Sequence, residues 1–205
     1  MNFRSDFLKI EAIEFKPQGL FYKEDYLTQQ EHDDLFFLLQ NNFYWDTQPQ
    51  RREVKQYGQI YNYRKQKFEE TFELIPNWLR ALIKRLVQDE IFSEEPNQVI
   101  INKYRQTGNR NWSIPPHIDS AELFGSCIAS ITLGNSCIIE FCKAYHENNP
   151  EIIHTLQVQP RSLYFMTGIS RYEYYHRIPD KKYNQVLDPH SQANVRISLT
   201  FRNIL

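Results

Sequence analysis

Apolar residues repeat at helical spacing in two segments of the first half of the chain, Thr28–Asn41 and Pro76–Gln88. Thr28 and Glu31 have the spacing of a capping box, and Pro76 stands where a first helical turn tolerates proline. The apolar faces consist of leucines and one isoleucine: Leu35, Leu38, Leu39, Leu79, Leu82, Ile83 and Leu86. The pattern therefore predicts two amphipathic helices.

From Gln98 onward the pattern changes to short runs, several of them alternating, that are separated by turn residues. The predicted strands are Gln98–Tyr104, Cys127–Leu133, Ser136–Cys142, Ile152–Val158, Ser162–Thr167, Arg171–His176 and Val195–Arg202. Gly134 and Asn135 are typical of a two-residue turn, which predicts a hairpin in which Cys127 faces Cys142.

Many short strands with closely spaced turns favour a sandwich or a jelly roll. The elements together predict an α+β, mainly β fold, a double-stranded β-helix (jelly roll) with N-terminal helices packed on one sheet. Because the sequence has no recognisable linker, we expect a single domain over residues 1–205. Residues 1–95 would form an N-terminal extension with the helices, and residues 96–205 would form the jelly-roll core.

The composition narrows the class of protein only a little. Of the 205 residues, 41% are hydrophobic and 24% are charged, which is typical of a globular domain. No apolar run is long enough to span a membrane, and the N-terminus lacks the apolar core of a signal peptide. The three cysteines have no CxxC spacing, which favours reduced thiols. We therefore expect no membrane association and an intracellular location, in the cytoplasm, the nucleus or both.

Histidines and one aspartate form the most informative motif. His117 and Asp119 are two apart on an extended segment, so their side chains point to the same side. A second histidine from a later strand completes two imidazoles and one carboxylate, the ligand set of non-haem Fe(II) oxygenases. Spacing alone does not choose among His146, His154 and His176 for that third ligand.

The segment Arg196–Arg202 alternates between apolar and polar side chains. Its two arginines lie on one face, roughly 20 Å apart along the backbone. Charged residues on an inner face are costly unless they are paired, and the arginine fork suits carboxylates. The two arginines could therefore clamp a small dicarboxylate. The alternative is a solvent-facing polar strand with ion-paired arginines.

In combination these motifs resemble the AlkB-like family of Fe(II)/2-oxoglutarate dioxygenases, from roughly Arg51 to the C-terminus. The matching residues are Asn102, Tyr104, Gly108, Ile114, His117, Asp119, His176, Arg196 and Arg202. The sequence is most similar to the branch that contains the tRNA wobble-uridine hydroxylase. It departs from the family in the longer spacing around Asn109–Ser113, and in Arg177, where a glycine commonly follows the distal histidine.

The resemblance implies that His117, Asp119 and His176 hold Fe(II) and act in catalysis through the iron. It also implies that 2-oxoglutarate and O2 are the cosubstrates, and that succinate and CO2 are released as a substrate C–H bond is oxidised. The outcome would be demethylation of an N-methyl group or hydroxylation of a stable carbon.

The resemblance also assigns the cosubstrate contacts. It implies that Arg196 binds the distal carboxylate of 2-oxoglutarate, assisted by Asn102 and the Tyr104 hydroxyl. Arg202 would lie nearer the metal-bound end of the same molecule.

Residues 50–67 carry six basic side chains and one acidic side chain, a formal charge of +5, with tyrosines in between. Cations neutralise phosphates and aromatic faces stack on exposed bases, so the segment favours nucleic-acid contact. The candidate substrate-binding residues are Arg51, Arg52, Tyr57, Tyr61 and Tyr63. In AlkB-like proteins the corresponding region forms the nucleotide-recognition lid. The alternative is a basic loop or edge hairpin whose tyrosines pack on the core.

The leading hypothesis is an oxygenase that acts on a nucleic-acid base, with RNA or tRNA ahead of DNA. A protein partner could supply RNA binding or methyltransferase activity, since proteins of the resembled branch often carry both modules. One alternative is a protein-directed AlkB-like hydroxylase or demethylase. The other is a non-catalytic jelly-roll binding module, although buried arginines without a ligand would destabilise such a module.

Overall fold

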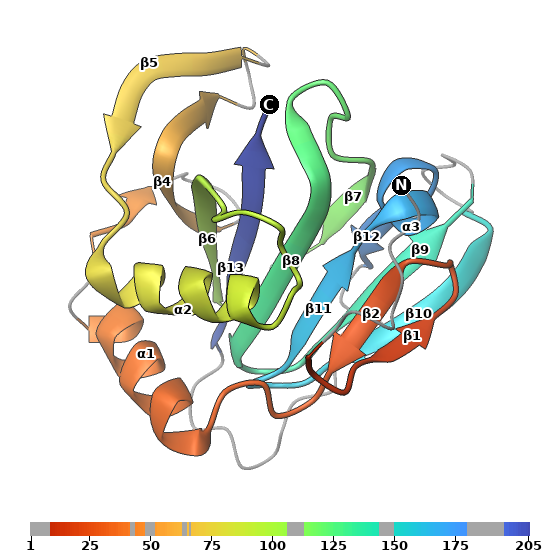
Figure 1. Ribbon diagram of the computed structural model, residues 1–205, viewed down its shortest axis with the longest axis horizontal. Helices are drawn as coiled ribbons and strands as arrows, with labels where there is room; N and C mark the ends of the chain where they lie inside the picture. Colours follow the sequence, from red (N-terminus) through yellow and green to blue (C-terminus); the bar gives the residue numbers. More distant parts are fainter. Residues whose placement is uncertain are drawn as a thin grey trace.

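A computed structural model describes residues 9–41, 44–47, 52–62, 65, 67–105, 113–143, 150–179 and 195–205. Two β-sheets face each other in this structure, and two helices cover the outer face of the larger sheet (Figure 1). Two facing sheets with helices packed outside one of them are typical of a jelly roll with an added helical layer. In the described part of the chain, no helix is long and apolar enough to cross a membrane.

The larger sheet has nine strands. Its order is β1 (Ile13–Phe15), β2 (Leu20–Lys23), β11 (Leu163–Met166), β8 (Phe124–Gly134), β13 (Val195–Ile204), β6 (Gln98–Arg105), β4 (Glu53–Asn62) and β3 (Asp46–Thr47), and β5 (Lys67–Glu73) pairs with β4 off this path. Strands from the first 62 residues thus extend the sheet that the later strands form. The smaller sheet has the order β10 (Ile152–Val158), β9 (Cys137–Cys142), β12 (Tyr175–Ile178) and β7 (Ile114–His117).

The apolar core has two layers. The first lies between the larger sheet and the helices α1 (Gln29–Asn41) and α2 (Asn77–Gln88), and it includes the predicted leucines Leu39, Leu79 and Leu86. The second lies between the two sheets and is smaller. Both predicted helices are present within one residue of their expected bounds, because their apolar stripes match this first layer.

Strand β13 carries the alternation that the sequence shows. Ile197, Leu199 and Phe201 belong to the helix-side core layer. Arg196 and Arg202, each 2% exposed, lie on the opposite face, between the sheets. The alternative of a solvent-facing strand is therefore wrong, and the interior of the jelly roll holds two buried guanidinium groups.

Two sequence expectations about strands are wrong. The Gly134–Asn135 turn does not close a hairpin, because β8 and β9 belong to different sheets and Cys127 does not face Cys142. The backbone N–H groups of Gly134 and Asn135 instead donate to His32 Nε2 and to the Val195 carbonyl. These hydrogen bonds to residues outside the turn direct the chain from the larger sheet to the smaller sheet. All three cysteines are buried free thiols.

The expected strand Arg171–His176 is instead a short helix, α3 (Gly168–Tyr172), followed by β12. The tyrosine-rich sequence has high strand propensity, which the tertiary structure overrides here. Ser170 donates its hydroxyl to the Thr167 carbonyl at 2.9 Å, and the Arg171 side chain is buried. The Ser170 hydrogen bond and the burial of Arg171 both favour a helical turn at this point.

An ion pair joins the two helices. At the start of α1, the Thr28 N–H donates to the Glu31 carboxylate at 2.8 Å, and the Glu31 N–H donates to the Thr28 hydroxyl, which confirms the capping box. Arg85 of α2 forms an ion pair with the same carboxylate and also donates to the Tyr26 carbonyl. The Arg85 hydrogen bond lowers the pKa of Glu31 from 4.5 to about 2.

Replacing Glu31 by glutamine should lower the free energy of unfolding by about 1 kcal/mol at pH 7, the value for a partly exposed pair. The pKa of Glu31 is depressed by folding, so its stabilisation is complete above pH 4.5 and disappears as the pH falls toward 2. Urea unfolding at several pH values measures this difference, with Asp34→Asn on the same helix as a control. If the difference in unfolding free energy between wild type and Glu31→Gln stayed constant down to pH 2.5, the result would contradict the ion pair between Glu31 and Arg85.

Candidate active site

Cross-strand register brings two distant histidines together. His117, the last residue of β7, pairs directly with His176 of β12 in the smaller sheet. Their ring centroids are 4.2 Å apart. Asp119 follows in the loop after β7, and its Oδ2 lies 3.7 Å from His176 Nε2. The ligand atoms of the three residues all lie within 4.8 Å of one another, so one metal ion could contact all three.

Of the other candidate histidines, His154 does not join this group. His154 lies on β10, where its ring contacts Phe15 with 5.0 Å between the centroids. His146 lies outside the described residues. Among the described residues, the structure thus brings His176 rather than His154 to His117 and Asp119, a choice that spacing alone left undecided.

The two imidazoles are prepared for metal binding. His117 Nδ1 lies 3.0 Å from the Pro115 carbonyl, and because a carbonyl only accepts, Nδ1 must carry the proton. This tautomer leaves Nε2 of His117 free for a metal. Burial lowers the pKa of His176 to about 3, and the neighbouring His117 adds to the shift although Asp119 opposes it. His176 is thus a neutral imidazole at pH 7.

Asp119 supplies the negative charge of the site. Burial works against its carboxylate, but electrostatic interactions with His176 and Arg202 outweigh that effect and hold the pKa of Asp119 below its usual range. Arg202 Nη1 lies 3.5 Å from Asp119 Oδ1. An ionised carboxylate beside two imidazoles matches the facial ligand set of non-haem Fe(II) enzymes.

A short chain of hydrogen bonds fixes Arg202. Its Nε donates to Gln98 Oε1 at 2.5 Å, and Gln98 Nε2 donates to the Gln59 carbonyl of β4 at 2.6 Å. The Arg202 guanidinium also lies over the Phe124 ring, 3.6 Å from its centroid. Gln98, which is fully buried, therefore connects β4 to the arginine that faces Asp119.

Replacing Gln98 by leucine should lower the free energy of unfolding by about 1–3 kcal/mol, because Arg202 Nε and the Gln59 carbonyl lose a buried partner. We also expect a roughly tenfold loss in kcat/KM for 2-oxoglutarate, as for other residues that orient a ligand. Urea unfolding and succinate assays measure the two effects. Asn203→Ala, which removes an exposed hydrogen bond of β13, the strand that carries Arg202, is the control. Unchanged kcat/KM in Gln98→Leu would contradict the positioning of Arg202 by Gln98.

Arg196 lies at the other end of the same face of β13, without an acidic partner among the described residues. Its Nη2 donates to the Thr132 hydroxyl at 3.3 Å, and its guanidinium lies 5.3 Å from the Tyr104 ring centroid. Arg196 Nε and Asn102 Oδ1 are both buried and lack a hydrogen-bond partner. A buried cation with an unused donor is costly unless an anionic ligand compensates it.

These residues fit the groups that the sequence resemblance implies. A pair of histidines with one carboxylate suits Fe(II), and a buried arginine with an unused donor suits a carboxylate of 2-oxoglutarate. Tyr104 and Asn102 come from β6, which is hydrogen-bonded to β13 with Tyr104 opposite Arg196. Strand pairing thus gathers the three candidate cosubstrate residues at one place.

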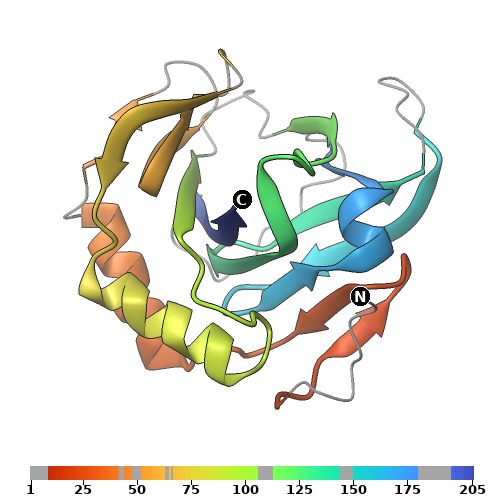
Figure 2. The same ribbon diagram turned by 45° about the horizontal axis from the view of Figure 1, so that its top comes forward.

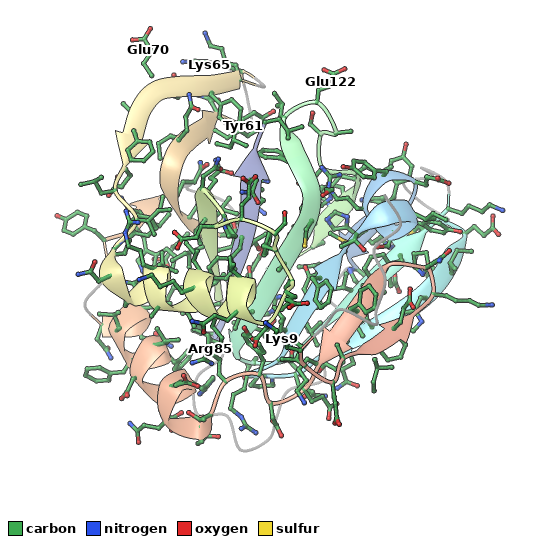
Figure 3. All side chains as sticks on the ribbon, in the orientation of Figure 1. Lys9, Tyr61, Lys65, Glu70, Arg85 and Glu122 are labelled. Atoms are coloured by element: carbon green, nitrogen blue, oxygen red, sulfur yellow. The ribbon has the colours of Figure 1, made fainter. Side chains whose placement is uncertain are left out.

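The β4–β5 hairpin (residues 53–62 and 67–73) lies at the same end of the jelly roll as β7, and Figure 2 shows the two on either side of β13. Tyr61 packs edge-on against Phe68 of β5 and against Phe124, the ring below Arg202. Figure 3 shows Tyr61 between the hairpin and the end of β8. The hairpin is therefore joined to the candidate metal site through aromatic contacts.

The structure changes the expected substrate-binding set. Tyr57 is 8% exposed and belongs to the helix-side core, so it is not available for stacking on a base. Tyr61 is equally buried but lies beside the site. Arg52 is half-buried just before β4, whereas Arg51 and Tyr63 lie outside the described residues.

The hairpin is also less basic than its sequence indicated. Glu69, Glu70 and Glu73 of β5 reduce the formal charge of residues 50–73 from +5 to +2. Lys55 forms an ion pair with Glu73 at 2.7 Å, and Lys65 forms one with Glu69 at 3.1 Å. Strand pairing thus neutralises part of the basic patch.

Arg177, the departure beside the distal histidine, is neutralised as well. Its Nε lies 2.6 Å from Glu140 Oε2, and Glu140 is directly opposite it on β9. The added charge is therefore held away from the candidate ligands. Of the other departure, the longer spacing around Asn109–Ser113, residues 109–112 lie outside the described residues.

Two residues near the site were not found from the sequence. Gln98 is the first residue of a strand, and Arg171 was placed in a strand that does not form. Only the unusual occurrence of a polar or charged residue next to apolar runs could have indicated them. Their roles depend on partners about 50 to 100 residues away in sequence.

Comparison with known proteins agrees with this geometry. The family model of the 2OG-Fe(II) oxygenase superfamily matches residues 9–202. The chain belongs to this superfamily, and its cofactors are Fe(II), 2-oxoglutarate and O2. Within the superfamily it is AlkB-like, as its sequence relatives show.

One relative is Uncharacterized protein L905 of Acanthamoeba polyphaga mimivirus, 32% identical over 88% of this chain and 82% of that protein. Another is the tRNA (carboxymethyluridine(34)-5-O)-methyltransferase alkbh8 of Xenopus tropicalis, 26% identical over 83% of this chain. The chain spans only 26% of that methyltransferase. The solved structure of OsALKBH1 has a TM-score of 0.66 and 15% identity, and the match covers 94% of this chain and all of that one. It has the same fold.

Proposed function

We propose that this AlkB-like oxygenase oxidises a C–H bond on a nucleic-acid base, with RNA or tRNA ahead of DNA. The observation that carries the proposed chemistry is the ligand group of His117, Asp119 and His176, together with the buried Arg196, which has no acidic partner among the described residues. When bound, Fe(II) supplies the redox chemistry that couples conversion of 2-oxoglutarate to succinate and CO2 with oxidation of the substrate.

The roles of the chain's own residues follow from their contacts. His117 and His176 offer imidazole nitrogens, and Asp119 offers an ionised carboxylate. Arg196 holds the distal carboxylate of 2-oxoglutarate, with Tyr104 and Asn102 beside it. Arg202 keeps Asp119 in place and faces the metal-bound end of the cosubstrate.

The β4–β5 hairpin supports a nucleic-acid substrate by its position beside the candidate site. An enzyme that acts on a base must receive it unpaired or flipped, and an aromatic edge next to the metal suits a planar ring. Tyr61 and Phe124 provide that edge, and Arg52 provides positive charge at the start of β4. The similarity to a tRNA-modifying methyltransferase supports RNA, although this chain covers only a quarter of that protein.

The test is succinate formation by iron-reconstituted protein, with and without total small RNA, followed by mass spectrometry of the nucleosides. We expect RNA to stimulate turnover and one nucleoside to change. Arg52→Ala should weaken RNA binding and reduce its salt dependence. Lys9→Ala is the control, because Lys9 forms an exposed ion pair with Glu90 far from the hairpin (Figure 3). Stimulation by DNA or protein but not by RNA would contradict the proposed substrate. The absence of any turnover would contradict the proposal that the protein catalyses this oxidation.

A further inference from the structure

We propose that Arg171 is a positioning residue that holds the loop after β7 and thereby sets the place of Asp119 in the metal site. This inference rests on the proposed metal site. Arg171 is 2% exposed and is among the largest fully buried side chains of the protein. No carboxylate among the described residues forms an ion pair with it.

The Arg171 guanidinium is satisfied by backbone carbonyls of the loop after β7 and of the first two residues of β8. Its Nη1 donates to the carbonyl of Asp119 itself at 2.7 Å. Its Nη2 donates to the carbonyls of Ser120 at 3.0 Å and Phe124 at 3.3 Å, and its Nε donates to that of Gly125 at 3.3 Å. Four acceptors between residues 119 and 125 therefore surround one buried fork.

The loop needs such a partner because it has little regular structure of its own. Residues 118–123 lie between β7 and β8 and form no strand pairs. Without Arg171, carbonyls of this loop would be buried without a donor, which costs free energy and favours another loop conformation. The planar guanidinium can reach several carbonyls at once, whereas a lysine ammonium is a point charge that cannot span them.

Arg171 also lies close in sequence to the other ligand segment. It belongs to α3, which directly precedes β12 and His176. Its guanidinium lies 4.9 Å from the ring centroid of Tyr172, which limits its movement. A single side chain thus joins the segment that carries Asp119 to the segment that carries His176, and this junction orders the ligand set before metal binds.

The experiment is a titration of the metal-free full chain with Co(II), followed by its visible ligand-field absorption, on wild type and Arg171→Lys. We expect Arg171→Lys to bind Co(II) at least tenfold more weakly and with an altered spectrum, because Asp119 is displaced. Arg85→Lys is the matched control, since Arg85 also donates to a backbone carbonyl but lies at the helix interface. It should lose thermal stability and keep the wild-type Co(II) affinity and spectrum.

The outcomes separate this inference from the proposed site. If wild type binds Co(II) no better than Asp119→Ala, the metal site itself is wrong. If wild type binds and Arg171→Lys matches it in affinity and spectrum while losing stability as Arg85→Lys does, Arg171 is only structural.

If Arg171→Lys does not fold, the second variant is Tyr172→Leu. It removes the aromatic ring beside the Arg171 guanidinium, and because Tyr172 is 41% exposed, the substitution leaves the core intact. We then expect a several-fold weaker Co(II) affinity. An unchanged affinity in that folded variant would overturn the proposal.

Discussion

Replacing Asp119 by alanine should reduce the conversion of 2-oxoglutarate to succinate by roughly a thousandfold or more, as expected when a member of a catalytic unit is removed. The carboxylate is the only negative group among the three candidate ligands. Its loss leaves only the two imidazoles, whose affinity for Fe(II) is much lower, and it deprives the buried Arg202 of the acid at 3.5 Å.

The measurement is succinate formation together with iron content after anaerobic reconstitution. Asp33→Ala serves as the control, because Asp33 is an acidic residue on the exposed side of α1 that contacts only α1 residues in the hydrogen bonds described here. We expect wild-type turnover and iron content in the control. Retention of more than a tenth of the turnover by Asp119→Ala would contradict the assignment of Asp119 as a ligand.

Replacing Arg196 by methionine should raise the KM for 2-oxoglutarate by roughly two orders of magnitude, the loss expected when one partner of a buried charge pair is removed. The same substitution should raise the melting temperature of the cosubstrate-free protein. Arg196 is a buried cation with an unpartnered Nε and no acidic neighbour in the described part of the chain, so an apolar side chain of similar length removes a cost.

Without 2-oxoglutarate, Arg196→Met should melt at a higher temperature than wild type. Saturating 2-oxoglutarate should make wild type the more stable of the two, because the ligand stabilises only the protein that binds it. Thermal unfolding with and without 2-oxoglutarate measures the reversal. Arg85→Met is the contrasting control, since Arg85 has an acidic partner and its loss should destabilise the protein in both conditions. A lower melting temperature of Arg196→Met without cosubstrate would show that Arg196 is already compensated and would contradict its role as a vacant carboxylate receptor.

The parts of the fold that were predicted correctly are those with a strong local pattern. The stripes of α1 and α2 and the alternation of β13 each reflect one buried face. The Gly134–Asn135 turn shows the limit of local reasoning. Its sequence is typical of a hairpin, but the acceptors that redirect the chain, His32 and Val195, come from distant elements.

The candidate metal site was predictable in part because its ligands are of unusual types at a recognisable spacing. The choice of His176 over His154 required the pairing of β12 with β7, which is not visible in the sequence. The hairpin shows the opposite case. Its lysines form a basic patch in the sequence, but strand register places Glu73 beside Lys55, and only the structure shows that neutralisation.

The most direct test of the central claim is a crystal structure of the protein grown with Mn(II) and 2-oxoglutarate, with anomalous scattering to locate the metal. We expect a single Mn(II) bound by His117, Asp119 and His176, and one carboxylate of 2-oxoglutarate on Arg196. A metal bound elsewhere, or 2-oxoglutarate held without Arg196, would contradict the site described here.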